Sequence, residues 1–143
     1  MEDKFKFFHH LKVRYSEIDA QKIVFNAHYL TYLDIAATEY FEEALKLDLL
    51  PMAENDEFDF VLAKTTMEYK QPARLWDWLQ IWCRVKSIGN SSFTMEFLIT
   101  KEGENSPVLT AEIIYVSYST KRDKAVPVPE FIRNRMNEFE KKK

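Results

Sequence analysis

The chain has 143 residues and a formal net charge of -3 at pH 7, so residues 1–143 are expected to fold as a single domain. This charge argues against nucleic acid as a partner, because phosphate binding needs a concentrated basic face. No apolar run approaches the roughly 20 residues that span a bilayer, and the N-terminus lacks a signal-peptide core, so we expect a cytoplasmic protein with no membrane span.

The first segment alternates between apolar and polar residues, a period that is typical of a half-buried β-strand. Its apolar face contains Phe5, Phe7, Leu11, Val13 and Tyr15. The alternation stops at residues 17–22, where polar residues predominate. We therefore predict one strand followed by a polar loop.

The next segment changes to a helical period. From Ala27 to about Leu47, apolar residues recur every three or four positions, at Leu30, Leu33, Ala37, Phe41 and Ala44. No glycine or proline interrupts this stretch, and Asn26 before it is a suitable N-cap. We predict one long helix, followed by an exit loop that contains Pro51.

The rest of the chain predicts four strands and a short terminal helix. Apolar or alternating runs separated by turns occupy residues 58–70, 79–86, 93–100 and 108–118. Pro127 and Pro129 then introduce the helix. Its apolar face contains Ile132, Met136 and Phe139.

Consecutive strands with one long helix against them indicate an α+β domain with a five-stranded antiparallel sheet. A helix this apolar is expected to be wrapped by the sheet. Edge strands of such a sheet remain unpaired, so we expect association with a second copy of the chain.

The scarcity of certain residues excludes several classes of site. The only glycines, Gly89 and Gly103, lie too far apart for a P-loop, a dinucleotide fingerprint or a nucleophile elbow. Three histidines and one cysteine show no metal-ligand spacing, so we expect neither a metal nor a cofactor. Cys83 alone allows no internal disulfide, which fits a reducing compartment.

Asp19 is the candidate catalytic group, because it precedes Asn26, at the predicted helix start, by seven residues. The first turn of a helix carries unpaired N–H groups and a partial positive charge, which can polarise a carbonyl and stabilise an oxyanion. A carboxylate nearby could attack that carbonyl or take a proton from water. An aspartate in such a loop also serves as a cap or turn residue, so spacing alone leaves both roles open.

A resemblance favours the catalytic role. The stretch V-R-Y-S-E-I-D-A-Q-K-I-V-F-N-A-H-Y-L, from Val13 to Leu30, resembles the opening motif of the 4-hydroxybenzoyl-CoA thioesterase family of hot-dog proteins. The stretch M-E-Y-K-Q-P-A-R, from Met67 to Arg74, resembles a later motif of that family. The resemblance implies a hot-dog fold, in which the sheet wraps one long central helix, and hydrolysis of acyl-CoA thioesters.

The resemblance also implies roles for individual residues. Asp19 would be the nucleophile or general base, and the backbone N–H near Asn26 would polarise the thioester carbonyl. Tyr15 matches a tyrosine near the site and is expected to belong to the catalytic group with Asp19 and Asn26. Family sites form between subunits of a homodimer or dimer of dimers, so Val61 and Lys64 of a partner would line the acyl pocket. Other expected substrate contacts are Phe25, His28 and, for CoA phosphates, Arg74.

Two departures from the family pattern keep an alternative open. Lys22 stands in a loop where the family usually has glycine, and Asn26 stands where many relatives have histidine. An amide cannot shuttle a proton at neutral pH. The alternative is therefore a protein that binds acyl-CoA or another acyl carrier without cleaving it. A hot-dog dehydratase lacks support, because no histidine–carboxylate pair has a suitable spacing.

Overall fold

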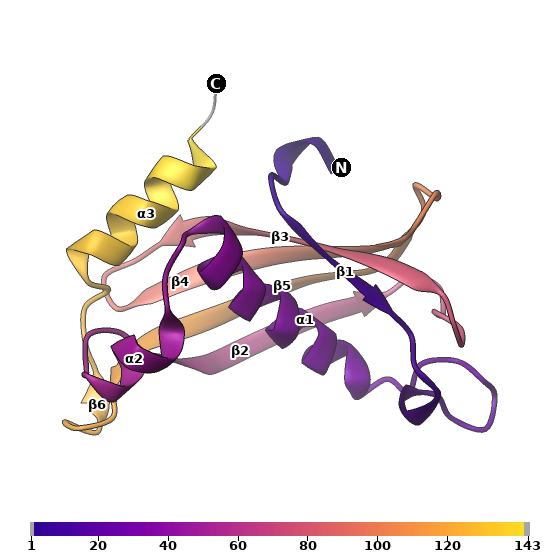
Figure 1. Ribbon diagram of the computed structural model, residues 1–143, viewed down its shortest axis with the longest axis horizontal. Coiled ribbons are helices and arrows are strands. Elements are labelled where there is room, and N and C mark those ends of the chain that lie inside the picture. The colour runs from indigo at the N-terminus through magenta and orange to yellow at the C-terminus, as the bar shows by residue number, and fades with distance from the viewer. Residues whose placement is uncertain (1, 142–143) are drawn as a thin grey trace.

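The computed structural model describes residues 2–141, which form an α+β fold around one antiparallel sheet (Figure 1). The sheet has the strand order β1-β3-β4-β5-β2, with a short strand β6 paired to β5. The strands are β1 (Phe8–Lys12), β2 (Phe60–Tyr69), β3 (Trp78–Ile88), β4 (Ser92–Lys101), β5 (Pro107–Ser119) and β6 (Lys124–Ala125). The five predicted strands are confirmed, and the structure contains one further strand, the two-residue β6, that the sequence does not predict.

The long helix lies along the concave face of the sheet. α1 (His28–Glu39) continues directly into a π-helical turn, η3 (Tyr40–Ala44). The side chains that face the sheet are Tyr29, Tyr32, Leu33, Ala36, Ala37, Tyr40 and Phe41, all buried. The predicted cap is wrong: Ala27 occupies the N-cap position and no side chain caps the helix.

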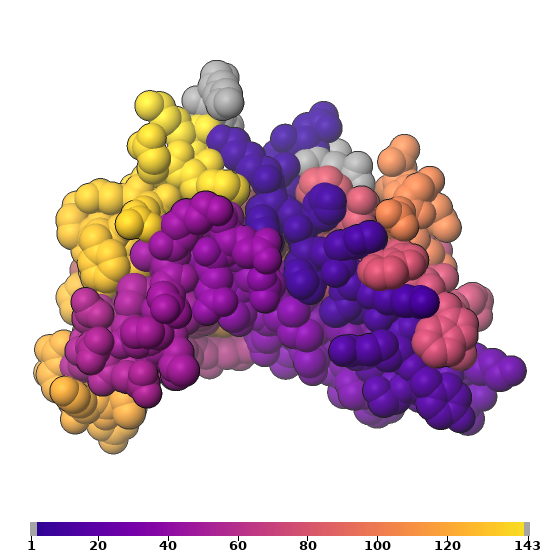
Figure 2. Space-filling model, in the orientation of Figure 1, coloured from indigo at the N-terminus to yellow at the C-terminus, as the bar shows by residue number. Residues whose placement is uncertain are grey.

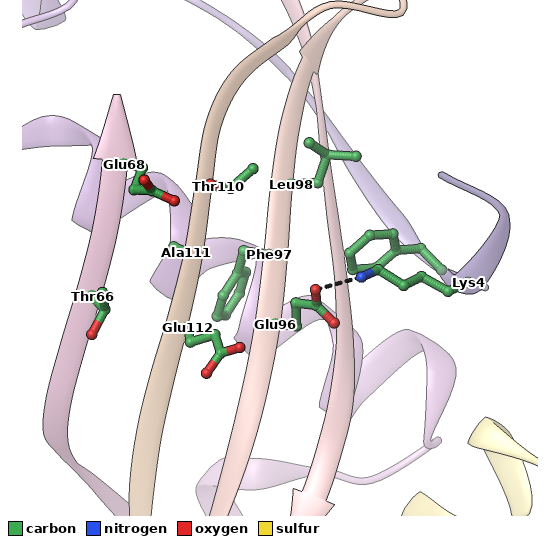
Figure 3. A pocket seen from close by; sticks show the side chains of 10 residues that line it. Lys4, Thr66, Glu68, Glu96, Phe97, Leu98, Thr110, Ala111 and Glu112 are labelled. Carbon is green, nitrogen blue, oxygen red and sulfur yellow. Dashed lines mark hydrogen bonds and ion pairs between the residues drawn. The ribbon is translucent and has the colours of Figure 1, made fainter. Parts of the chain in front are cut away.

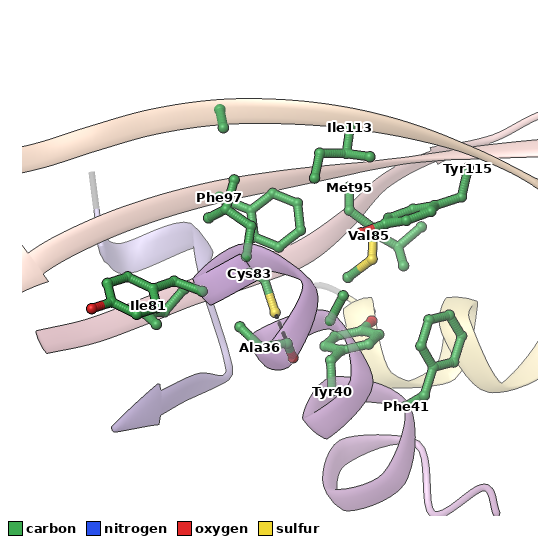
Figure 4. Close-up of a cluster of buried hydrophobic side chains, with 14 of the residues drawn as sticks. Ala36, Tyr40, Phe41, Ile81, Cys83, Val85, Met95, Phe97, Ile113 and Tyr115 are labelled. Atoms are coloured by element: carbon green, nitrogen blue, oxygen red, sulfur yellow. Dashed lines mark hydrogen bonds between the residues drawn. The ribbon is translucent and has the colours of Figure 1, made fainter. Parts of the chain in front are cut away.

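Small residues on α1 let the helix lie close to the middle strands. Figure 4 shows Ala36 beneath the fully buried Cys83 of β3, whose Sγ lies 3.7 Å from the Ala36 carbonyl oxygen. Burial raises the pKa of the Cys83 thiol well above its usual value. Cys83 therefore acts as a small apolar core residue.

Aromatic side chains fill the core around the π-helical turn. The Phe41 ring stacks on Phe60 at 4.9 Å between centroids, and the Phe93 ring stacks on Tyr115 at 5.5 Å. Phe41 of the helical segment thus contacts rings of β2 and β4, and Tyr115 of β5 packs against the same two rings, Phe60 and Phe93. The core therefore fixes how the sheet curls around the helix.

Three local predictions differ from the structure. The first strand ends at Lys12, and Tyr15 lies in a 3₁₀ turn, η2 (Tyr15–Glu17), with 74% of its surface exposed. Glu17, expected in a polar loop, is 6% exposed. The exit loop around Pro51 contains a short helix, α2 (Leu49–Glu54), where proline is tolerated because it lies in the first turn.

The predicted terminal helix is confirmed as α3 (Glu130–Glu140), and Ile132 and Met136 of its apolar face are fully buried. Figure 2 shows the face that the N-terminal residues (indigo) and the α1–α2 region (purple to magenta) cover. Among residues 2–141, no helix is long and apolar enough to cross a membrane.

Candidate active site

Asp19 lies at the turn of a small hairpin between β1 and α1. Ile18 pairs with Val24 in an antiparallel bridge, and the Asp19 N–H donates to the Ile23 carbonyl at 2.9 Å. The Lys22 N–H closes the turn on the Asp19 carbonyl at 2.9 Å. The predicted polar loop is thus an ordered hairpin, in which Asp19 has a fixed backbone position.

The Asp19 carboxylate takes part in the turn with one oxygen only. Its Oδ1 accepts a hydrogen bond from the Gln21 N–H at 2.8 Å. Within residues 2–141, Oδ2 receives no hydrogen bond. The side chain is half-buried. One carboxylate oxygen is therefore held by the backbone while the other remains available to a ligand.

The hairpin is attached to a second loop that precedes β3. Val24 N–H donates to the Ala73 carbonyl at 2.9 Å, and Leu75 N–H donates to the Lys22 carbonyl at 3.3 Å. Ile23 and Arg74 form a further antiparallel bridge. Residues 73–75 therefore brace the hairpin as a third extended segment, and Arg74 lies beside it as an exposed cation.

The start of α1 provides unpaired backbone donors. The first bonds of the helix run from the His28 N–H to the Phe25 carbonyl (2.9 Å) and from the Tyr29 N–H to the Asn26 carbonyl (3.4 Å). The N–H groups of Asn26 and Ala27 have no acceptor in the described part of the chain. Such groups at a helix start, together with the helix dipole, suit an oxyanion.

A groove of about 310 Å³ lies between this helix start and the end of β2. Its lining comprises Ile23, Val24, Asn26, Tyr29, Tyr69, Lys70, Gln71 and Pro72. Two of these residues, Ile23 and Val24, belong to the Asp19 hairpin. The groove therefore borders both the carboxylate-bearing turn and the unpaired N–H groups.

Sequence reasoning missed the two tyrosines of this groove. Tyr29 is 3% exposed, and its hydroxyl accepts a hydrogen bond from the Ala73 N–H at 3.1 Å. Burial raises its pKa, so the phenol keeps its proton. The Tyr69 ring lies 5.7 Å from the Tyr29 ring and is 54% exposed. Tyr69 belongs to the second stretch that resembles the family, Met67 to Arg74, but only the fold brings that stretch to the helix start.

The other predicted site residues around the hairpin vary in position. Asn26 is exposed and lines the groove. Phe25 is 49% exposed, and its ring lies 6.0 Å from the half-buried His28 ring. The Tyr15 hydroxyl has no hydrogen-bond partner among residues 2–141. These side chains surround the hairpin without contacting Asp19 through any hydrogen bond.

Val61 and Lys64 lie on β2, apart from the Asp19 hairpin of the same chain. They precede Tyr69 by eight and five residues, or about 26 and 17 Å along an extended strand. Val61 is 43% exposed and Lys64 is also exposed. One chain therefore does not bring these two residues to its own groove.

A second hollow of about 310 Å³ lies on the outer face of the sheet (Figure 3). Lys4 Nζ lies 2.6 Å from the Glu96 carboxylate there, and Arg84 Nε lies 2.8 Å from the same group. This hollow is on the face of the strands opposite to α1, so it is separate from the groove at Asp19. Among residues 2–141, no three His, Cys, Asp or Glu side chains are grouped as a metal site would require.

Comparison with protein families supports a single assignment over most of the chain. The model of the thioesterase-like superfamily matches residues 13–136. The acyl-CoA thioester hydrolase YbgC of Escherichia coli O6:H1 is 30% identical over 122 residues, which cover 85% of this chain and 89% of that protein. The long-chain acyl-CoA thioesterase FadM of E. coli K12 is 28% identical over 131 residues, which cover 92% and 97% of the two chains.

Solved structures agree on the fold. A thioesterase from Thermus thermophilus, crystallised with coenzyme A and zinc, superposes with a TM-score of 0.83 at 27% identity, covering 99% of this chain and 98% of that one. The fold implied by the resemblance in sequence, a long helix wrapped by an antiparallel sheet with a short C-terminal helix, is confirmed.

Proposed function

Because the chain belongs to the thioesterase-like superfamily, we propose that it hydrolyses acyl-CoA thioesters to a free carboxylic acid and CoA. The observation that carries the proposal is the meeting of three elements at one groove: the Asp19 hairpin, the unpaired N–H groups of Asn26 and Ala27, and the end of β2. Acyl-CoA is the substrate class because the similar E. coli proteins are acyl-CoA thioesterases.

In the proposed reaction, the thioester carbonyl lies against the start of α1. The N–H groups of Asn26 and Ala27 stabilise the negative charge that forms on the carbonyl oxygen. Asp19 Oδ2 either removes a proton from an attacking water or attacks the carbonyl carbon itself. In the first route, water adds to the carbonyl carbon, the carbon–sulfur bond breaks, and the proton taken by Asp19 passes to the sulfur to give free CoA. In the second, Asp19 displaces the sulfur to form a mixed anhydride, and water then adds to the acyl carbon and breaks the bond to Asp19. This water supplies the acid's oxygen, regenerates the carboxylate and leaves a proton for the CoA sulfur.

The groove residues have binding roles in this proposal. The Tyr29 and Tyr69 rings, with Phe25 and His28 beside the helix start, contact the acyl-thioester segment. Tyr15, which is exposed close to the hairpin, contacts the CoA arm. Arg74 is placed to attract CoA phosphates, because it is exposed beside the hairpin and forms no ion pair within residues 2–141.

We propose that the active unit is at least a homodimer joined along β2. Within residues 2–141 this strand pairs only with β5, and it exposes Val61 and Leu62 by 43% and 42%. A long apolar edge strand is normally paired or covered. If two copies pair antiparallel about Thr65, Val61 of one copy lies opposite Tyr69 of the other. Such pairing would bring Val61 to the groove of the second copy. Lys64 would lie on the same strand, nearer to the axis of pairing at Thr65.

The test is thiol release from a panel of aromatic, short and long acyl-CoAs. Asp19→Asn should remain folded and lose at least about a hundredfold in kcat/KM, the usual contribution of a principal proton-transfer group. Asp48→Asn, an exposed carboxylate before α2, is the control and should retain wild-type turnover. Unchanged turnover in Asp19→Asn would exclude Asp19 as the catalytic group.

The alternative is an acyl-CoA or acyl-carrier binding protein without hydrolysis. Asn26 favours it, since an amide at the groove cannot move a proton. The same panel separates the two functions. Saturable binding of an acyl-CoA with no release of thiol, from CoA or acyl-carrier thioesters, would establish the binding function instead.

A further inference from the structure

Glu17 is a buried carboxylate two residues before Asp19. It is 6% exposed, which is unusual for a charged side chain in a segment between two elements. A charge this far from solvent needs partners, because desolvation otherwise favours its neutral form.

The partners of Glu17 come from both sides of the hairpin. Its Oε1 accepts hydrogen bonds from the Arg14 N–H at 2.9 Å and from the Tyr32 hydroxyl at 2.7 Å. Its Oε2 accepts from Arg14 Nε at 3.0 Å and also contacts the other end of the Arg14 guanidinium. Burial acts to raise the pKa of Glu17, but these hydrogen bonds outweigh it and the pKa is lowered. Glu17 is therefore a stable anion.

Tyr32 links this anion to the helix. It lies on α1, fully buried, one turn beyond Tyr29 of the groove, and the two rings meet edge to face at 6.0 Å. Burial and the adjacent Glu17 carboxylate both raise the pKa of Tyr32, so it remains a hydrogen-bond donor.

The backbone of Glu17 also closes the hairpin. Its carbonyl accepts a hydrogen bond from the Phe25 N–H at 2.9 Å. This bond joins the two ends of the hairpin that carries Asp19, since Glu17 precedes its first strand and Phe25 follows its second. The carboxylate fixes this closed hairpin to α1 through Tyr32. The same helix presents the unpaired N–H groups of Asn26 and Ala27 at its start.

We infer that Glu17 is a positioning residue: with Arg14 and Tyr32 it forms a clamp that holds Asp19 in register with the start of α1. This inference rests on the proposed function for its catalytic consequence. No residue of the clamp lines the groove; Tyr32 reaches it only through its contact with the Tyr29 ring. Its loss should move Asp19 relative to the oxyanion donors and lower kcat, while leaving KM nearly unchanged.

The chain contains a matched control for this clamp. At the far end of the same helical segment, the buried Tyr40 hydroxyl donates to the Glu140 carboxylate of α3, which also accepts the Val85 N–H at 3.0 Å. Tyr40→Phe and Tyr32→Phe therefore delete the same group, a buried phenol that donates to a carboxylate. Only Tyr32 is joined to the Asp19 hairpin.

The first experiment compares kcat and KM of the two variants with thermal unfolding of each. Tyr32→Phe should lower kcat at least about tenfold with KM within about twofold, since a displacement of about 1 Å at a reacting group can cost about a hundredfold. Tyr40→Phe should remain within about twofold in both constants. Glu17→Gln, which keeps Oε1, should retain more of kcat than Glu17→Ala. Equal losses in Tyr32→Phe and Tyr40→Phe would overturn the inference, because general destabilisation would then explain both.

The second experiment does not depend on activity. Hydrogen exchange of the Asp19, Val24 and Phe25 amides reports on the closed hairpin directly. Exchange at these amides should accelerate in Tyr32→Phe and remain slow in Tyr40→Phe. If the wild-type protein cleaves no thioester, the proposed function fails while this comparison still tests the clamp. Unchanged exchange, or faster exchange with unchanged kcat, would overturn it.

Discussion

Lys22 has a backbone conformation that glycine adopts more easily. Its φ is 64°, in the left-handed region, where a side chain costs about 1–2 kcal/mol. The position lies in the loop where the resembling family usually has glycine. The Lys22 N–H and carbonyl bonds to Asp19 and Leu75 hold this conformation. The turn at Asp19 therefore places a lysine in a conformation that favours glycine.

Replacing Lys22 with glycine should stabilise the fold. Relief of the left-handed strain outweighs the extra chain entropy of glycine, which costs about 0.5–1 kcal/mol, so Lys22→Gly should gain up to about 1 kcal/mol. Urea unfolding at an unchanged m-value measures the gain. Lys22→Ala removes the charge and keeps Cβ, so it should gain nothing. A Lys22→Gly protein no more stable than Lys22→Ala would show that the turn is unstrained.

At the scale of elements, period alone predicts most of this fold. The helix and the strands have clear spacing, because their buried faces repeat every 3.6 or 2 residues. Glu17 shows where such patterns end. Its burial depends on a guanidinium three residues earlier and a phenol fifteen residues later. A polar residue in a loop follows no regular period, so the sequence pattern does not reveal these partners.

The groove could be predicted only in part for the same reason. Asp19 and Asn26 belong to one recognisable motif, whereas Tyr69 reaches the site because β2 lies at the edge of the sheet. Tyr15 fits the alternation of the first strand, but the chain leaves the sheet at Lys12 and a 3₁₀ turn places Tyr15 in solvent. Strand order and strand ends depend on tertiary packing, which local pattern does not encode.

Both edges of the sheet expose apolar residues, which permits a direct test of the proposed β2 interface. Val61→Lys should weaken self-association at least about tenfold, because it buries a charge against a second β2. Sedimentation over a range of concentrations measures the strength of self-association, and activity per chain should fall as the fraction of dimer falls. Phe8→Lys on β1, at 38% exposure against 43% for Val61, is the matched control and should stay associated. If Phe8→Lys dissociates the protein and Val61→Lys does not, the copies associate along β1, at the other edge of the sheet.

At the scale of the whole molecule, two buried or half-buried carboxylates tie the N-terminal segment to the rest of the fold. Glu17 connects the segment after β1 to α1, and Glu96 of β4 holds Lys4, which lies 92 residues away in sequence (Figure 3). Burial acts to raise the pKa of Glu96, but Lys4 and Arg84 outweigh it, and the pKa is lowered from 4.5, as it is for Glu17.

The sign of these shifts predicts how the fold responds to acid. A carboxylate whose pKa is lower in the folded state contributes stability that is fully present above its unfolded pKa and is lost as pH falls through the folded pKa. Stability from Glu17 and Glu96 should therefore be constant from pH 7 to about pH 5 and decline below about pH 4.5. Protonation then releases Lys4 and Tyr32 together, so the N-terminal segment should loosen first.

Glu96→Gln isolates one of these contributions. The variant should lose about 1 kcal/mol at pH 7, a value reduced from that of a buried charged hydrogen bond because solvent reaches the pair. The difference from the wild type should shrink as pH falls below about 4.5 and vanish once pH is below the lowered pKa of folded Glu96, where the carboxyl is protonated in both states. Glu112→Gln is the control: this residue faces Glu96 across β4 and β5, but its ion pair with Lys86 is far more exposed, so little should change. A Glu96→Gln deficit that persists undiminished at low pH would mean that packing, rather than charge, makes Glu96 stabilising.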